Sequence, residues 1–180
     1  MGQSGKTLNM VIKGTAINKY QISKEIEEKA KERFDSYYGT YFKDLKSIFR
    51  VLATYLQMKG HDVYLYFKNG ERLIIDEKTR LKDREDVLIE YLSNRETGRL
   101  GWGYTNESNY LAYLFPTKGC YFLDTQLIRK WVCDKTSSFW NYEDAEATNE
   151  RNGSIYHTDS KIIPICDLEA FGIVKWHLKL

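Results

Sequence analysis

The chain has few cysteines, and their spacing excludes a zinc site or a disulfide framework. Its 180 residues include three cysteines. These are Cys120, Cys133 and Cys166, an odd number with no Cys-x-x-Cys pair. Such cysteines are expected to be free thiols in a reducing compartment. The sequons at Asn106 and Asn152 then carry no meaning as glycosylation sites.

Long apolar runs are also missing. No stretch approaches the roughly 20 residues that span a bilayer, and the N-terminus has no signal-peptide hydrophobic region. A P-loop is excluded because two residues, not four, separate Gly2 from Gly5. The three histidines are scattered, and no Ser-His-Asp or Cys-His set stands out. We therefore expect a cytoplasmic protein with no membrane partner, and the oligomeric state stays undetermined.

The net charge of +2 is too small to identify a nucleic-acid partner, although local clusters matter more than the sum. Hydrophobic residues make up 42% and charged residues 29% of the chain, which is typical of a globular protein. We expect one domain over residues 1–180. The 14 tyrosines, eight phenylalanines and four tryptophans suit a core, and some of their rings could stack on bases.

The first third of the chain predicts two helices before a hairpin. Apolar residues recur every four positions from Ile22 to Phe34, which indicates an amphipathic helix over 22–38 that ends near Gly39. A second helical pattern covers 45–56, with Gly60 as its C-terminal stop. A short strand is expected at 10–12.

The remainder predicts strands with one capped helix. Residues 83–94 fit either a helix or a buried strand, and the glycines that follow favour the strand. Strands are expected at 109–115, 121–123 and 162–165. Asp124 is positioned to cap a helix that carries Leu127 to Val132. Asp167 is positioned to cap a final helical turn. The polar stretch 139–153 reads as a long loop. The expected fold class is α/β (α+β), a mixed, mainly antiparallel sheet flanked by helices.

One hairpin carries the functional signal. Residues 60–67 and 73–79 flank a Lys68-Asn69-Gly70 turn, and the second strand is apolar on both faces before it breaks into Asp76-Glu77-Lys78. Residues two apart share a face, so Asp76 and Lys78 project together. A two-residue turn would pair Asp62 with Glu77, whereas a three-residue turn with a glycine bulge would pair it with Asp76. The competing interpretation is a solvated salt-bridge cluster at a sheet edge.

Five segments occur in an order that resembles the PD-(D/E)XK nuclease superfamily, in particular its small phage-type nuclease-like proteins. They are Gly60-His61-Asp62-Val63, Ile75-Asp76-Glu77-Lys78, Leu88-Ile89-Glu90, Gly101-Trp102 and Ser108-Asn109-Tyr110-Leu111. The resemblance covers roughly residues 60 to 115. His61 stands where the superfamily name has proline. The implied fold is restriction-endonuclease-like.

The resemblance implies a metal-dependent DNA endo- or exonuclease, encoded by a phage or mobile element. Asp62, Asp76 and Lys78 would be its catalytic residues. The same two aspartates and the Glu77 backbone carbonyl would hold Mg²⁺ or Mn²⁺. A second metal would use Glu90, or a glutamate of the first helix, Glu25 or Glu28.

Basic residues follow the hairpin directly. Arg80, Lys82 and Arg84 lie where a DNA backbone approaching the metal would pass, although acidic residues intervene. The alternative function is a non-catalytic member of the same fold that binds DNA or a protein, such as an inhibitor of a bacterial defence nuclease. A third is an interaction protein in which the charged triplet has no function.

Overall fold

The computed structural model of the chain describes residues 16–151 and 153–179, with side chains from residue 28 to 150 and from 153 to 179. The strand expected at 10–12 and the side chains of Ile22, Glu25 and Ile26 lie outside this part. The helices are α1 (Ala16–Tyr41), α2 (Thr54–Gln57), α3 (Trp102–Thr105), α4 (Thr125–Cys133), the 3-10 helix η1 (Ser138–Asn141) and α5 (Ile165–Ala170).

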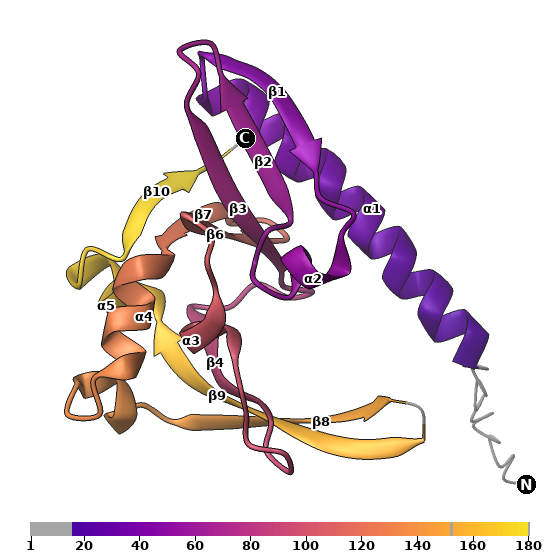
Figure 1. Cartoon of the computed structure of the whole chain (residues 1–180), viewed down its shortest axis with the longest axis vertical. Coiled ribbons are helices and arrows are strands. Elements are labelled where there is room, and N and C mark those ends of the chain that lie inside the picture. The colour runs from indigo at the N-terminus through magenta and orange to yellow at the C-terminus, as the bar shows by residue number, and fades with distance from the viewer. Residues whose placement is uncertain (1–15, 152, 180) are drawn as a thin grey trace, which may run out of the picture.

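Ten strands form two sheets in the described residues (Figure 1). The larger sheet has the order β1-β2-β3-β6-β7-β10 and the smaller one β5-β4-β9-β8. The strands are β1 (Leu45–Arg50), β2 (Val63–Phe67), β3 (Arg72–Thr79), β4 (Asp86–Asn94), β5 (Arg99–Leu100), β6 (Tyr110–Phe115), β7 (Gly119–Asp124), β8 (Asp144–Arg151), β9 (Ser154–Pro164) and β10 (Val174–Leu178).

The larger sheet is mixed and mainly antiparallel, as predicted. β3 and β6 pair in parallel, and the other neighbours in both sheets run antiparallel. The chain leaves β3, builds β4, β5 and α3 on one side, and returns as β6. The α+β class is therefore confirmed.

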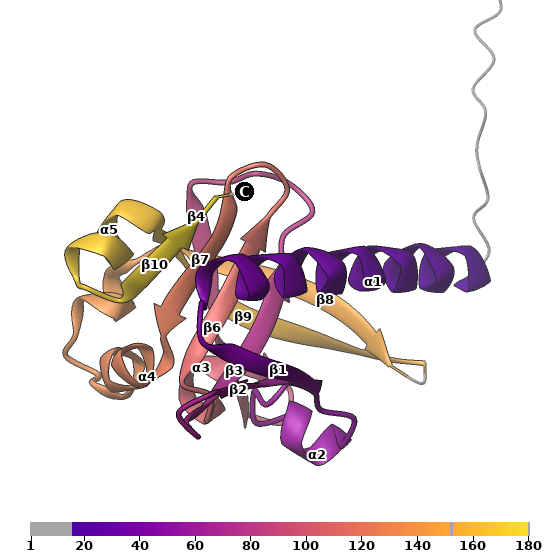
Figure 2. The same cartoon turned by 90° about the horizontal axis from the view of Figure 1, so that it is seen from above.

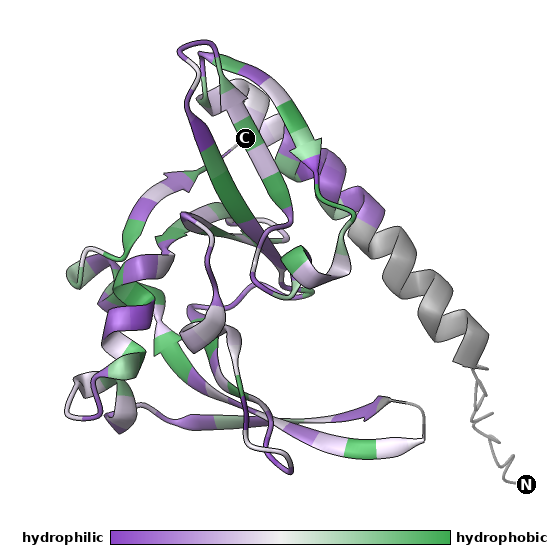
Figure 3. Ribbon diagram, viewed as in Figure 1, coloured by the Kyte–Doolittle hydropathy of each residue, from purple (hydrophilic) through white to green (hydrophobic). Residues whose placement is uncertain are grey.

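Two hydrophobic clusters cover the two faces of the larger sheet. On one face, Phe34 and Tyr38 of α1 pack on Leu65 and Ile75. On the other face, residues of β6 and β7 pack against α4, α5, β4 and β9. Seen from above, α1 lies beside β1, with α4 and α5 at the other end of the molecule (Figure 2). Hydrophobic residues are concentrated in β2, β3 and the end of β9 (Figure 3). In β3, Ile75 belongs to the cluster on the α1 side, and the neighbouring Asp76 is buried as well.

The helix predicted over 45–56 is wrong. Residues 45–50 form strand β1, and only Thr54–Gln57 are helical. Leu45 and Ile48 pack against the α1 cluster, whereas Phe49 on the alternate face is exposed. A register shift between Leu45 and Ser47 lets both apolar residues face α1. Their three-residue spacing therefore imitates a helical period.

The loop predicted over 139–153 is also wrong. It contains η1 and strand β8, which pairs with β9 along its whole length. The strand is polar because its pairing partner, and not burial of an apolar face, holds it in place. The final helix begins after Pro164, so Asp167 lies in its first turn and accepts a hydrogen bond from the Tyr142 hydroxyl at 2.7 Å.

Several other expectations are confirmed. Residues 86–94 are strand β4, and β6 and β7 match the strands predicted around the Pro116–Gly119 turn. The first helix has the predicted core but extends beyond both predicted ends. Within the described residues, every helix is too short or too polar to cross a lipid bilayer.

Asp124 caps α4 as expected, because its carboxylate accepts a hydrogen bond from the Leu127 N–H at 3.0 Å. Replacing Asp124 with alanine should lower the free energy of unfolding by about 1 kcal/mol, measured by urea denaturation. Asp124→Asn, an equally good cap, should retain most of that stability. Equal losses in both variants would show that the ion pair with Lys175, at 3.5 Å, matters more than the cap.

Candidate active site

The β2–β3 turn sets the register that the nuclease resemblance requires. The Phe67 N–H donates to the Glu71 carbonyl at 3.0 Å, and Gly70 has a left-handed φ of 88°. The regular ladder ends at the Val63–Ile75 pair, and the Asp62 N–H donates to the Ile75 carbonyl at 3.0 Å. Asp62 therefore lies at the end of the hairpin, close enough to Asp76 for its charge to raise the pKa of that carboxyl.

Asp76 is sealed in the interior, with 1% of its surface exposed. Its Oδ1 accepts a hydrogen bond from Lys78 Nζ at 2.5 Å, and its Oδ2 accepts one from Asn106 Nδ2 at 2.7 Å. Lys78 keeps 38% of its side chain exposed. The pair is therefore not the solvated cluster of the competing interpretation, since only the lysine reaches solvent.

The environment of Asp76 favours its neutral form. Burial raises the pKa of the carboxyl, the neighbouring Asp62 raises it further, and Lys78 opposes both, so the pKa is about 7. For Lys78, burial lowers the pKa, but attraction to Asp76, Asp62 and Glu90 outweighs it and raises the pKa above its usual value. Two carboxyls and a retained ammonium therefore occupy one end of the hairpin.

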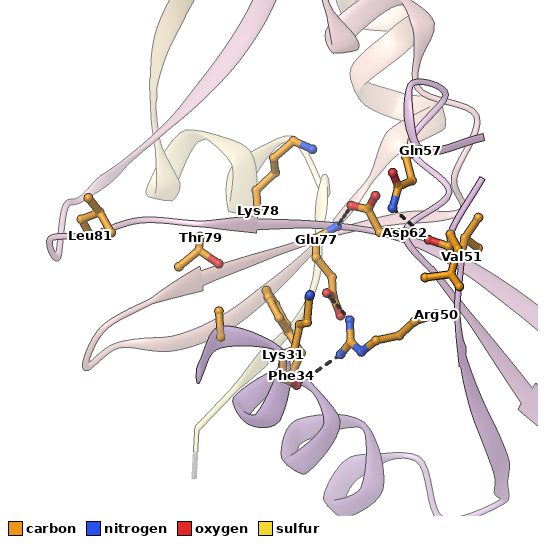
Figure 4. A pocket seen from close by; sticks show the side chains of 12 residues that line it. Lys31, Phe34, Arg50, Val51, Gln57, Asp62, Glu77, Lys78, Thr79 and Leu81 are labelled. Carbon is orange, nitrogen blue, oxygen red and sulfur yellow. Dashed lines mark hydrogen bonds and ion pairs between the residues drawn. The ribbon is translucent and has the colours of Figure 1, made fainter. Parts of the chain in front are cut away.

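The Glu77 side chain takes the opposite direction, toward α1 (Figure 4). Its carboxylate accepts hydrogen bonds from the Tyr38 hydroxyl and from Arg50 Nη1, both at 2.8 Å. Arg50 also donates to Asp35 at 2.6 Å. This network joins α1, β1 and β3 and leaves the Glu77 carboxylate 9% exposed. Only the backbone of Glu77 faces the site.

That backbone points at Asp62. The Glu77 N–H donates to Asp62 Oδ2 at 2.9 Å, and the Asp62 N–H donates to the Ile75 carbonyl at 3.0 Å. Because the N–H and C=O of one residue in an antiparallel strand leave on the same side, the Glu77 carbonyl also points toward Asp62. The predicted carbonyl ligand is therefore beside the two carboxylates.

Glu90 of β4 lies near this end of the hairpin. Burial raises its pKa, and a hydrogen bond with the Trp102 backbone and the charge of Lys78 oppose the increase. Its interaction with the site is electrostatic and passes through Lys78. Glu28 of α1 accepts a hydrogen bond from Lys31 at 2.8 Å, on the α1 side.

Among the described residues, no three His, Cys, Asp or Glu side chains gather as a metal-binding group. Asp62, Asp76 and the Glu77 carbonyl nevertheless form a set of oxygen donors, the type that Mg²⁺ and Mn²⁺ prefer. The donor chemistry fits one such ion. Both Asp76 oxygens are already hydrogen-bonded, so binding would require Lys78 to give up its contact.

A pocket of about 620 Å³ opens beside Asp62 and Lys78, between α1, β1 and β3. Its wall includes Lys31, Arg50 and Glu77 (Figure 4). The exposed Leu52 also lines it. The hollow lies on the α1 side of β3, and Asp76 is not among its lining residues.

The three basic residues predicted to contact DNA have different surroundings. Arg80 donates to Asp86 at 2.6 Å and is partly buried. Lys82 and Arg84 are exposed in the loop after β3 and form no ion pair within the described part of the chain. The intervening acids are engaged elsewhere, Asp83 with Thr117 and Glu85 with Lys118. Lys82 and Arg84 are therefore the free cations of this loop.

Asn106 is the site residue that the sequence interpretation missed. It is 2% exposed, and while its amide nitrogen donates to Asp76, its oxygen accepts from the Ser108 N–H at 2.9 Å. It stands two residues before Ser108, where the last segment of the resemblance begins. A sequence pattern does not reveal it, because α3 and the β3–β6 crossover bring it to Asp76.

Comparisons with protein-family models, curated proteins and solved structures gave no match for this chain. The functional argument therefore rests on the geometry of the site.

The raised pKa of Asp76 predicts how stability depends on pH. An unfolded aspartic acid ionises near about pH 4, so between pH 4 and 7 the native state keeps a proton that the unfolded chain has lost. The stability contributed by the neutral carboxyl then decreases as pH rises, and it levels off above about 7.

We expect Asp76→Asn to gain stability relative to the wild type from pH 4 to 8, by up to about 4 kcal/mol. Urea denaturation at stepped pH measures the difference. Asp134→Asn is the control, because hydrogen bonds from Thr136 lower the pKa of Asp134 and confine its effect to more acidic solution. Parallel pH profiles for wild type and Asp76→Asn would contradict the assignment.

Gly60 packs against the Asn106 amide. Its φ is +81°, and a Cβ there would lie 2.2 Å from Asn106 Oδ1. Gly70 has a similar φ of +88° with no atom within 4 Å of a Cβ. Both alanine substitutions should cost about 1–2 kcal/mol in backbone strain. Gly60→Ala should cost about 1–3 kcal/mol more, because it displaces a buried hydrogen-bonding group. Equal losses in chemical denaturation would show that Asn106 is not fixed by this contact.

Proposed function

We propose that this protein is a metal-dependent nuclease that hydrolyses DNA phosphodiester bonds, of the PD-(D/E)XK type and encoded by a phage or mobile element. The observation that carries the proposal is the convergence of Asp62, Asp76 and Lys78 with the Glu77 carbonyl at one end of the β2–β3 hairpin.

Asp62, Asp76 and the Glu77 carbonyl would hold Mg²⁺ or Mn²⁺. The ion supplies polarisation of a phosphoryl oxygen and a nucleophilic water at neutral pH. Ion binding would favour the ionised form of Asp76 and release the Lys78 ammonium from it. Lys78 then remains a cation with a partly exposed side chain, placed to stabilise negative charge that develops on the phosphate.

The DNA backbone would contact the loop that follows β3. Lys82 and Arg84 are exposed cations there, and Arg80 is neutralised by Asp86. Phosphate contacts of this kind position a strand without reading its sequence. Glu90 would act through Lys78, or would serve a second ion after a rearrangement of its side chain.

A second candidate is a non-catalytic protein of the same fold that binds DNA or a protein, such as an inhibitor of a bacterial defence nuclease. One observation favours it. Asp76 is buried, and both of its oxygens are satisfied by Lys78 and Asn106. A carboxylate whose two oxygens are both hydrogen-bonded needs no metal ion to stabilise it.

Cleavage of supercoiled, linear and branched DNA with Mg²⁺ or Mn²⁺ distinguishes the two candidates. We expect cutting that is lost with EDTA and reduced about 10²- to 10³-fold in both Asp76→Asn and Lys78→Met. These variants keep the size of the side chain and remove its charge.

The matched controls are Asp134→Asn and Lys175→Met, which carry the same changes away from the hairpin and should cut like the wild type. A wild type that binds DNA without cutting it, and whose binding survives both site substitutions, would reject the nuclease and leave the binding protein.

A further inference from the structure

The larger sheet presents an aromatic surface on the face opposite α1. Phe49 of β1 lies directly across from Tyr64 of β2, with ring centroids 6.2 Å apart and planes inclined by 19°. Tyr66 meets Tyr64 edge to face at 6.4 Å. The Arg72 guanidinium of β3 lies over the Tyr64 ring at 4.8 Å. We call Phe49, Tyr64, Tyr66 and Arg72 the aromatic platform.

The platform is not part of the core. Val63 and Leu65 of β2 point to the α1 side and are fully buried, so the alternating Tyr64 and Tyr66 point the other way. Phe49 is 56% exposed and Arg72 is exposed as well, whereas Tyr64 and Tyr66 are half-buried. Exposed aromatic residues at the edge of a sheet invite unwanted association. A ligand that covers the rings accounts for their presence.

The platform continues into the candidate active site. Tyr66 and Tyr64 share one face of β2, about 6.6 Å apart, and Asp62 directly precedes this strand. The Tyr64 hydroxyl lies 3.0 Å from Nδ1 of His61, the residue next to Asp62. A ligand seated on the rings would therefore lie next to Asp62, the more accessible of the two carboxylates.

The chemistry of the platform selects the ligand. Flat rings accept the faces of nucleobases in any sequence, and an adjacent arginine binds phosphate or stacks on a base. The bases of a duplex are stacked on one another and cannot lie on protein rings. A protein partner would use the rings too, but it has no need for their alignment with Asp62.

We infer that the aromatic platform binds single-stranded nucleic acid, with bases stacked on Phe49 and Tyr66 and with Arg72 contacting the backbone. The strand then leads to Asp62, Asp76 and Lys78. This inference rests on the proposed function, because the path of the nucleic acid toward Asp62, Asp76 and Lys78 assumes that these residues form a nuclease site. It makes the preferred substrate a single strand, or the unpaired part of a branched molecule.

The test is binding without catalysis. Fluorescence anisotropy in EDTA gives the dissociation constant of a labelled thymidine oligonucleotide and of an abasic oligonucleotide of the same length. Phe49→Ala should weaken binding of the thymidine strand about 5- to 150-fold, which corresponds to one stacked base. It should leave the abasic strand unaffected, because that strand has the same charge and no base to stack.

Phe171→Ala is the matched control. Phe171 is 50% exposed, similar to Phe49, and it packs on Trp131 after α5, away from β1 and β2. This variant should bind both oligonucleotides like the wild type. Arg72→Gln should weaken both strands and reduce the dependence of binding on salt.

Equal affinity of wild type and Phe49→Ala for the thymidine strand would overturn the inference, and a surface for a protein partner predicts this result. Tighter binding of a duplex than of a single strand would overturn it as well. Because these measurements need no cleavage, a protein that fails to cut DNA can still support the platform. If the Phe49→Ala variant cuts DNA normally and binds the thymidine strand as tightly as the wild type, the proposed nuclease function stands and the inference about the aromatic platform is rejected.

Discussion

Burying the Asp76 carboxyl in the larger sheet costs several kcal/mol unless its oxygens are bonded, and two segments meet that requirement. β3 itself supplies Lys78, and the crossover from β3 to β6 supplies Asn106. The turn at Gly70, the tight packing of Gly60 and the path of α3 are each arranged around this one group. Both functional proposals begin from the same carboxyl.

β3 separates two kinds of chemistry by the alternation of its side chains. Ile75 and Glu77 face α1, where Glu77 completes an ionic network with Arg50 and Tyr38. Asp76 and Lys78 face the opposite side, beside Glu90. The network on the α1 face fixes the position of the strand, so the groups on the other face keep their geometry. Changes to the α1 network should therefore reach the site through the backbone of β3.

Local pattern was sufficient to predict the β2–β3 hairpin, the Asp124 cap and the convergence of Asp62 with Asp76, because each depends on a turn or on the alternation of neighbouring residues. Local pattern failed where pairing with another strand determines the structure. Leu45 to Arg50 imitates a helix until β2 pairs with it, and polar β8 is held by β9. Asn106 was not identified because its role exists only after the crossover has closed.

The parallel pairing of β3 with β6 has a consequence for the order in which the protein folds. The β2–β3 hairpin forms from adjacent residues, but residues 80–109 must be built before β6 can join β3. Closing such a connection is slow compared with forming a hairpin. The Asp76 carboxyl therefore gains its bond to Asn106 only after this connection has closed, later than the hairpin on which it lies.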